Sequence, residues 1–200
     1  VLREASIGTL VRFMDGQPAA GYCGPRLLNP DGSHQPSARR FPTVLSTAFT
    51  MLGLAARAPT SRHALDLHGQ RDNRGCFRAD WLSGACLLVR AEVLRDIGLL
   101  DEGFFLYFEE TEWCHRMQVA GWEGWYVGTA DVTHYGGQSI AHESDVRPFS
   151  GNHPAHWIRS KQRYARQVHG PLGMWFERTT ELTLNSLIWL RHRWRPGDLS

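Results

Sequence analysis

The sequence lacks most of the features that would place the chain in a specialised class of proteins. Its 22 Lys and Arg residues nearly balance 20 Asp and Glu residues, so the net charge of +2 gives no electrostatic case for a nucleic-acid partner. Lysine is almost absent, since Lys161 is the only one and the other basic residues are arginines. The planar guanidinium of Arg matches phosphate and carboxylate groups well, so this bias fits a phosphorylated ligand.

Cysteine pairs of the C-x-x-C type are also absent. The four cysteines are scattered along the chain, at Cys23, Cys76, Cys86 and Cys114. This spacing predicts buried free thiols in a reducing compartment rather than disulfides or a zinc site. No signal peptide is visible, and no apolar run reaches the length of a membrane span. We therefore expect a cytoplasmic protein.

The most informative stretch runs from Gly98 to Trp122. An apolar, aromatic loop leads into a predicted helix with a carboxylate cluster on its first turn; the residues are Phe104, Phe105, Tyr107, Phe108, Glu109, Glu110 and Glu112. At the positive end of the helix dipole these carboxylates are expected to stay ionised near neutral pH. A capped amphipathic helix is the simplest interpretation. Four aromatic residues directly before the cluster instead favour the wall of a substrate pocket.

The rest of this helix follows a regular pattern. Trp113, Met117 and Ala120 fall on one face, and Glu112 can pair with Arg116 one turn later. Gly121 is expected to end the helix as its C-terminal cap.

The chain before this stretch alternates between predicted elements. A helix is expected over Ile7–Met14, a strand over Ala19–Cys23, and a hairpin-like excursion around Asn29–Gly32. An apolar helix follows over Val44–Ala56. The polar segment Arg57–Arg78 predicts a long loop.

The elements that flank the acidic helix complete this alternation. Cys86–Val89 predicts a buried strand, and Ala91–Ile97 a short helix capped by Gly98. Short strands are expected over Trp122–Val127 and Val132–Tyr135, with His134 on the second. The alternation of helices and strands predicts an α/β protein.

Two helices are expected at the C-terminal end, over Trp157–Val168 and Met174–Trp194, separated by Gly170 and Pro171. The second has Trp near both ends and a cluster of basic residues at its close, so it could lie on an anionic membrane surface. Packing against the domain or a partner is the alternative, and the pattern leaves both open.

Several motifs, taken together and in order, resemble the C-terminal half of a bacterial family-2 glycosyltransferase of the rhamnosyltransferase-like kind. They lie at Gly24–Thr43, Trp81–Arg90, Ile97–Arg116, Ala120–Trp122 and Val132–Ser139. The resemblance covers the chain from its first residue to about residue 170. It implies a mixed-sheet fold of the GT-A type. It also implies inverting transfer of a sugar from a nucleotide-diphosphate donor to a saccharide or lipid-linked saccharide acceptor, as in the synthesis of cell-surface polysaccharides.

The resemblance also assigns roles to individual residues. The family's Glu-Asp pair falls on Glu109 and Glu110, which makes Glu110 the candidate general base, with Glu in place of the usual Asp. His134 matches a histidine that joins the metal site, and a nitrogen ligand suits Mn²⁺ better than Mg²⁺. The residues expected around the acceptor, besides Glu109, are Trp81, Gly84 and Ala85 at the border of the pocket, and Phe105 and Tyr107 in its wall.

One part of the family pattern is missing. The Asp-x-Asp motif that holds the metal and the donor diphosphate in the family occurs nowhere in the sequence. The resemblance therefore predicts that residues 1–150 are the acceptor-side half of the catalytic domain, followed by a helical extension over 151–200, and that this half alone is inactive. The expected location is the cytoplasm, or the inner face of the cell membrane through peripheral contact.

Two other functions remain open at this point. A non-catalytic carbohydrate-binding or scaffolding protein could keep the acceptor half and lose the donor half, although such a protein needs neither a base nor a metal ligand. A metal-dependent hydrolase using Glu110 and His134 is the weaker alternative, because no H-x-x-x-H motif or carboxylate-rich cluster supports it.

Overall fold

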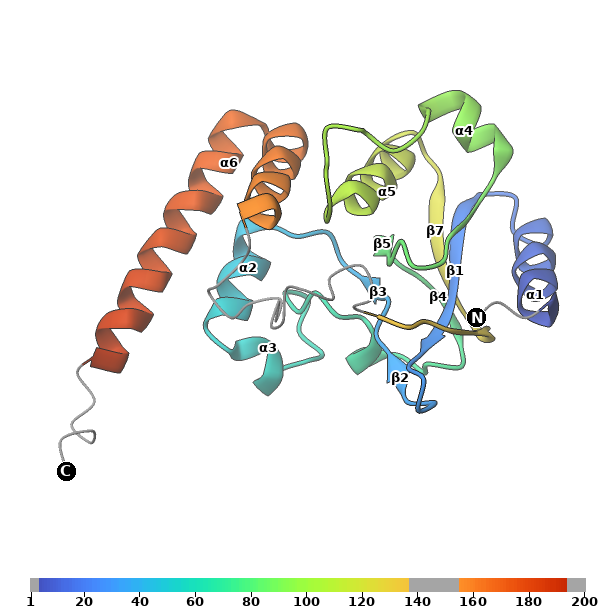
Figure 1. Ribbon diagram of the computed structural model, residues 1–200, viewed down its shortest axis with the longest axis horizontal. Coiled ribbons are helices and arrows are strands. Elements are labelled where there is room, and N and C mark those ends of the chain that lie inside the picture. The colour runs from blue at the N-terminus through green and yellow to red at the C-terminus, as the bar shows by residue number, and fades with distance from the viewer. Residues whose placement is uncertain (1–3, 137–154, 194–200) are drawn as a thin grey trace.

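The computed structural model describes residues 4–136 and 155–193, and its body is a mixed sheet with helices on both faces (Figure 1). Strands β1 (Ala20–Leu28) and β7 (Glu123–Thr133) run parallel at the centre. Strand β4 (Cys76–Arg78) pairs with β7, and β2 (His34–Gln35) and β6 (Leu88–Val89) pair with β1, all three antiparallel. The expected α/β class with a mixed sheet is confirmed.

Helix α1 (Glu4–Asp15) covers one face of the sheet. Its Leu10 and Met14 are buried against Cys23 of β1 and Val127 of β7. This helix agrees with the one predicted over Ile7–Met14.

Helix α5 (Glu109–Val119) covers the opposite face. Trp113 and Met117 pack there with Tyr22 and Tyr126, the strand neighbours of the residues that face α1. Because successive strand side chains point to opposite faces, each central strand supplies both halves of the core. Both faces of the β1–β7 pair are thus buried. Because α5 packs on one of these faces, the sheet fixes where the N-terminal end of α5 lies.

The local interactions of α5 largely follow the expected pattern. Arg116 Nε donates to Glu112 Oε1 at 2.7 Å, confirming the predicted pair. The amide of Gly121, where φ is +93°, donates to the carbonyl oxygen of Gln118, and Trp122 N–H donates to Met117 O. These two bonds form a Schellman cap, as expected of Gly121. Ala120, however, is exposed rather than packed with Trp113 and Met117.

Four predicted boundaries in the sheet region are wrong. The predicted loop 57–78 contains a 3-10 turn, η1 (His68–Gln70), and its last residues form β4. The first strand extends from Ala20 to Leu28, and 122–135 holds one strand, β7, rather than two. The segment 86–89 is half-buried, and only its last two residues form β6. Strands this short pair with segments far away in the chain. The sequence alone therefore carries little of the alternating pattern that marks a strand.

A second, two-stranded sheet lies beside the main one. It pairs β3 (Ala38–Arg39) with β5 (Trp81–Leu82). Helix α2 (Val44–Met51) follows and begins at a capping box between Thr43 and Ser46. The helix predicted to run to residue 56 breaks at Gly53, where φ is +69°, and α3 (Leu54–Arg57) follows. Helix α4 (Ala91–Ile97) matches its prediction, with Gly98 as its C-cap.

The C-terminal helix α6 (Ala155–Arg193) is two helices joined at a sharp kink (Figure 1). Gly170 has φ +72° and ψ 177°, which an L side chain rarely adopts, and Pro171 follows inside the helix. The predicted break at these residues is confirmed. The first half of α6 contacts α5, and α2 packs against α6. The division into units 1–150 and 151–200 stays a prediction.

Two further expectations concern the cysteines and the membrane. The four cysteines are free, as expected, but only Cys23 and Cys114 are buried, whereas Cys76 is exposed. Within the described ranges 4–136 and 155–193, no helix combines the length and the apolar character needed to cross a bilayer.

Candidate active site

A cavity of about 250 Å³ lies where β3, β5, α2, α5 and α6 meet. Segments far apart in the sequence close it from different sides. The lining residues are Pro36, Arg39, Pro42, Thr47, Leu65, Trp81, Ser83, Tyr107, Phe108, Glu110, Thr111, Trp157 and Lys161. Most of its wall is apolar or aromatic, and a few polar groups point inward, which is the usual composition of a small-molecule site.

Glu110 is the one carboxylate in the lining of this cavity, among the residues that the structure describes. It lies on the first turn of α5, and its Oε1 accepts a long hydrogen bond of 3.4 Å from the amide of Gly84. Its Oε2 is buried and has no hydrogen-bond partner among the described residues. The site therefore holds a carboxylate oxygen that can accept a proton or hydrogen bond from a ligand hydroxyl.

The pKa of Glu110 is raised from 4.5 to about 7, first by burial and then by repulsion from Glu109. Arg39 acts in the opposite direction and lowers this pKa. Burial also raises the pKa of Glu109. The expectation that these carboxylates stay ionised near neutral pH is therefore wrong for Glu110. Desolvation at the floor of the cavity outweighs the favourable end of the helix dipole.

The loop before α5 is strained at the point where it enters the cavity. Tyr107 and Phe108 have φ values of +68° and +66°, although neither is glycine. Such a conformation costs on the order of 1–2 kcal/mol per residue. The first half of α6 holds the two rings, because His156 stacks on Tyr107 with centroids 5.8 Å apart, and Trp157 meets Phe108 edge-on at 5.6 Å.

Trp81 forms part of the cavity wall and is fixed by its own hydrogen bond. Its indole Nε1 donates to the carbonyl oxygen of Arg40 at 2.9 Å. The guanidinium carbon of Arg39 lies 5.5 Å from the centre of the Trp81 ring, within the range of a cation–π contact. Burial lowers the pKa of Arg39, whereas Asp66 and Glu110 raise it.

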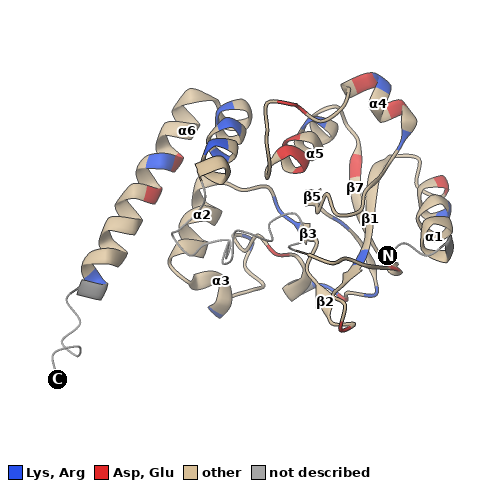
Figure 2. Cartoon of the chain, viewed as in Figure 1, with Lys and Arg blue, Asp and Glu red and all other residues tan. Residues whose placement is uncertain are grey.

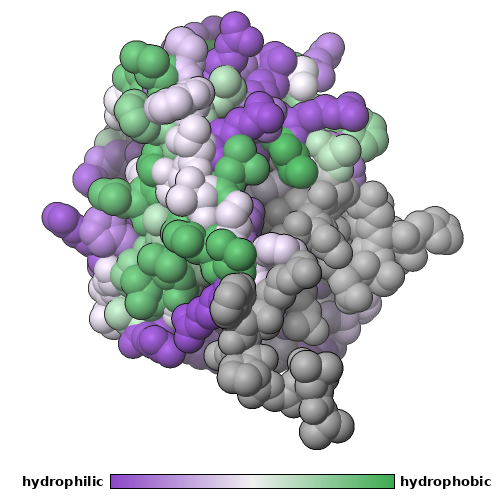
Figure 3. Space-filling view, turned by 90° about the vertical axis from the view of Figure 1, so that its left-hand side faces the viewer, coloured by the Kyte–Doolittle hydropathy of each residue, from purple (hydrophilic) through white to green (hydrophobic). Residues whose placement is uncertain are grey.

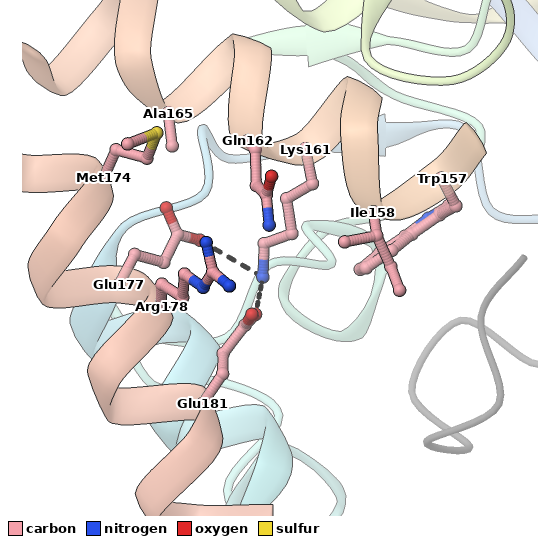
Figure 4. Close-up of a pocket in the computed structure, with 9 residues that line it drawn as sticks. All are labelled: Trp157, Ile158, Lys161, Gln162, Ala165, Met174, Glu177, Arg178 and Glu181. Atoms are coloured by element: carbon pink, nitrogen blue, oxygen red, sulfur yellow. Dashed lines mark hydrogen bonds and ion pairs between the residues drawn. The ribbon is translucent and has the colours of Figure 1, made fainter. Parts of the chain in front are cut away.

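Lys161 reaches the cavity from α6 but is already paired, as Figure 4 shows. Its Nζ lies 3.1 Å from Glu177 Oε1 and also contacts Glu181, both on the second half of α6. Thr47 of α2 donates to Glu177 Oε1 at 3.3 Å. This buried cluster joins the two halves of α6 to each other and to α2. Figure 2 shows that the basic first half of α6 lies near the acidic start of α5.

The structure brings together some of the residues predicted around the acceptor and separates others. Trp81, Tyr107 and Glu110 line one cavity, and Gly84 contacts Glu110 from an exposed turn. Ala85 is exposed on the same turn and does not line the cavity.

Phe105 and Glu109 lie outside the cavity. Phe105 is 86% exposed and borders a separate hollow beside α6, so it does not form the expected wall. Glu109 is half-buried beside Glu110, and its Oε2 has no hydrogen-bond partner in the described part of the chain.

His134 follows directly after β7 and is also outside the Glu110 cavity. Its Nδ1 lies 2.8 Å from Gln35 Oε1, and an amide oxygen can only accept, so Nδ1 carries the proton. The lone pair of Nε2 then stays available in the neutral ring, which is the arrangement of a metal-binding histidine. Over residues 4–136 and 155–193, however, no group of three or more His, Cys, Asp or Glu side chains could hold a metal ion. These residues alone do not make a metal centre.

Sequence reasoning gave no role to Arg39, Thr47, Trp157 or Lys161, although all four line the cavity. Arg39 belongs to the segment Gly24–Thr43 that carries part of the resemblance, which was the available signal. Trp157 and Lys161 could not be predicted to line the cavity, because the sequence of α6 does not indicate which element the helix packs against.

Comparison with known proteins places the chain beside glycosyltransferases. It is 30% identical over 167 residues to an N-acetylglucosaminyl-diphospho-decaprenol L-rhamnosyltransferase of Mycobacterium tuberculosis, covering 84% of this chain and 54% of that protein. It is also 33% identical over 92 residues to a low-salt glycan biosynthesis hexosyltransferase of Haloferax volcanii, covering 46% of this chain and 25% of that one. A third relative, the rhamnosyltransferase WbbL of Escherichia coli, is 34% identical over 56 residues, 28% of this chain and 21% of WbbL.

No protein-family profile and no solved structure matches the chain. The chain spans about half the length of the first of these relatives. Over 84% of its own length, it is homologous to rhamnosyltransferases.

Proposed function

We propose that the chain forms the acceptor side of an inverting glycosyltransferase, which moves a sugar from a nucleotide-diphosphate donor to a lipid-linked saccharide. The observation that carries the proposal is Glu110, a buried carboxylate with a pKa near 7 in a cavity with aromatic walls. The homology to rhamnosyltransferases supports the same reaction class, and one relative is named for a diphospho-decaprenol acceptor.

In this reaction Glu110 serves as the general base. The acceptor hydroxyl gives its proton to the carboxylate while its oxygen forms a bond to the anomeric carbon of the donor sugar. The bond from that carbon to the diphosphate oxygen breaks on the opposite face, and the diphosphate leaves with the electron pair, so the configuration inverts. A base works best when its pKa lies near the working pH, and a pKa of about 7 meets this condition.

The aromatic walls suit the acceptor. Trp81 and Tyr107 lie in the same cavity as Glu110, and ring faces of this kind pack against the apolar faces of sugars. The fixed indole of Trp81 and the clamped ring of Tyr107 hold these surfaces in place, so the acceptor hydroxyl can be positioned by binding.

The role of a metal ion stays a prediction. His134 can offer Nε2 to a divalent cation such as Mn²⁺ or Mg²⁺, but the described residues supply no further set of ligands around it. We therefore derive no catalytic step through a metal.

The second half of α6 offers a surface for the lipid end of such an acceptor. Large apolar side chains, 44–73% exposed, recur on its outer face: Leu172, Trp175, Phe176, Leu182, Leu187, Trp189 and Leu190. The acidic residues of this half, Glu177 and Glu181, turn inward to Lys161. Figure 3 shows apolar patches on this side of the molecule. A helix with aromatic and leucine side chains outward is typical of contact with a membrane interface.

The transfer reaction is tested in the longest protein product that contains this sequence. The assay uses a nucleotide-diphospho-rhamnose donor and an N-acetylglucosaminyl-diphospho-prenol acceptor. We expect Glu110→Gln to lower turnover by at least about 100-fold while donor binding is kept. Glu102→Gln, an exposed carboxylate in the same loop, is the matched control. Turnover near the wild-type level in the Glu110→Gln variant would exclude Glu110 as the base. Acceptor binding without any turnover in the wild type would favour the carbohydrate-binding alternative.

The membrane contact is tested by sedimentation with anionic and neutral vesicles. We expect the wild type to bind anionic vesicles, and Trp175→Glu with Leu182→Glu to abolish binding. Leu99→Glu, which charges an exposed leucine away from α6, should leave binding unchanged. Equal sedimentation of the wild type and the double variant would exclude this surface. Self-association that the double variant abolishes would instead assign the surface to a second copy of the chain.

A further inference from the structure

Backbone pairing with neighbouring segments holds Arg39 in the wall of the cavity that contains Glu110. It is the last residue of β3, paired with Trp81 of β5, and it also forms an isolated bridge with Asp66. These contacts leave its side chain between the cavity that contains Glu110 and a second hollow next to Asp66. The guanidinium is stacked over the Trp81 ring at 5.5 Å.

This half-buried guanidinium differs in its partners from other cations that are buried or half-buried in the structure. Arg26 forms a two-pronged pair with Asp131 at 2.7 and 2.9 Å, and Arg90 donates to the carbonyl oxygens of Ala20 and Met14. Lys161 is paired with two glutamates. The side chain of Arg39 makes no hydrogen bond or ion pair with any residue in the described ranges, and its one described contact is the Trp81 ring.

Arg39 is half-buried, and a cation that is partly desolvated without a paired anion opposes folding. Shielding part of a guanidinium from water without supplying protein acceptors is unfavourable, and a cation–π contact offsets only part of this loss. Asp66 and Glu110 are near enough to stabilise the charge through space, but neither forms an ion pair with it. Five donors in a rigid fork thus line the cavity without acceptors.

We infer that Arg39 is the anion-binding residue of this cavity and that its ligand is a diphosphate group. The inference rests on the proposed function, in which both substrates carry a diphosphate, one linking nucleotide to sugar and the other linking saccharide to lipid. The planar fork of Arg binds phosphate oxygens through two parallel hydrogen bonds, and the Trp81 ring holds the plane of the fork in one orientation. With Glu110 in the same wall, a diphosphate on Arg39 places the attached sugar beside the base.

The test measures binding rather than turnover, so it is separate from the test of Glu110. Calorimetric titration of the same protein uses three probes, which are inorganic pyrophosphate, a geranyl-diphospho-N-acetylglucosamine and deoxythymidine diphosphate. We expect Arg39→Met to weaken pyrophosphate binding at least about tenfold, and Arg39→Lys to give an intermediate loss because the charge remains without the fork. Arg95→Met, which removes an equal charge from an exposed site on α4, is the control.

The two larger probes identify the source of the diphosphate. A loss confined to the lipid-type probe assigns Arg39 to the acceptor, and a loss confined to the nucleotide assigns it to the donor. If Arg39→Met binds all three probes as well as Arg95→Met does, or if the wild type binds none at millimolar concentration, the inference is overturned.

Thermal unfolding gives a second readout that a structural role would not produce. Because the unliganded guanidinium is partly desolvated and has no ion-pair partner among the described residues, we expect Arg39→Met to raise the melting temperature of the free protein by about 2 °C. A residue that serves only to support the fold would lower the melting temperature when it is replaced. A lower melting temperature together with unchanged pyrophosphate binding would return Arg39 to a purely structural role.

Discussion

The raised pKa of Glu110 predicts a pH dependence of stability that a single variant can test. The pKa is 4.5 in the unfolded chain and about 7 in the folded protein, so folding favours the protonated carboxyl. This group contributes stability that is fully present below about pH 4.5 and is lost as the pH rises through about 7.

The size of the effect follows from the shift. A difference of about 2.5 pKa units (7 minus 4.5) corresponds to about 3 kcal/mol, at about 1.4 kcal/mol per unit. Most of this, about 2–3 kcal/mol, disappears between about pH 5 and pH 8. Glu110→Gln has no proton to lose at this position and therefore lacks this part of the pH dependence.

The measurement is urea unfolding of the wild type and of Glu110→Gln at several pH values over this range. Other titrating groups are common to both proteins, so they largely cancel in the difference between the two free energies of unfolding. We expect the variant to gain about 2–3 kcal/mol on the wild type from low to high pH. Parallel curves for the two proteins would refute the reasoning, because they would mean that Glu110 titrates alike in the folded and unfolded states.

Two further predictions concern neighbours of this site. Lys161→Met leaves Glu177 buried without its cation and should lower the free energy of unfolding by about 3 kcal/mol, whereas adding Glu177→Gln should recover much of the loss in urea unfolding. Equal stability of the single and double variants would contradict this. Burial is the main cause of the raised pKa of Glu110 and repulsion from Glu109 adds to it, so Glu109→Gln should move the acid limb of the pH–rate profile to lower pH. An unmoved limb would mean that Glu109 is not coupled to the base.

The elements with local signals were predicted well. The Gly121 cap, the Glu112–Arg116 pair and the break at Gly170 depend on residues within a few positions of each other. Strand β4 was missed because it is three residues long and is defined by pairing with β7, about fifty residues away. Nothing in its own sequence separates it from the loop before it.

The features of the candidate site differ in the same way, since some have a local sequence signal and others do not. Glu110 could be predicted as a candidate site residue because the acidic start of α5 is contiguous in sequence and carries a family pattern. The raised pKa of Glu110 was not predicted, because desolvation comes from residues of β3, β5 and α6 that close over it. Within the described part of the chain, the lack of an ion pair or hydrogen bond to the Arg39 side chain likewise depends on the residues that surround it. A sequence shows which charges exist, but only the fold shows which of them are shielded from water and which have a paired charge beside them.

The departures from ordinary folding rules are concentrated around one cavity, and the first half of α6 is the element that sustains them. Tyr107 and Phe108 are held in a left-handed conformation by rings of α6, and Ser160 donates to the carbonyl oxygen of Leu106 at 2.8 Å. Strain of this kind persists only where surrounding contacts enforce it, and it is typical of functional sites. Without these contacts, Tyr107 and Phe108 would relax from the left-handed backbone conformation. The start of α6 is therefore part of the machinery that shapes the cavity, and its sequence should be under the same constraint as that of α5.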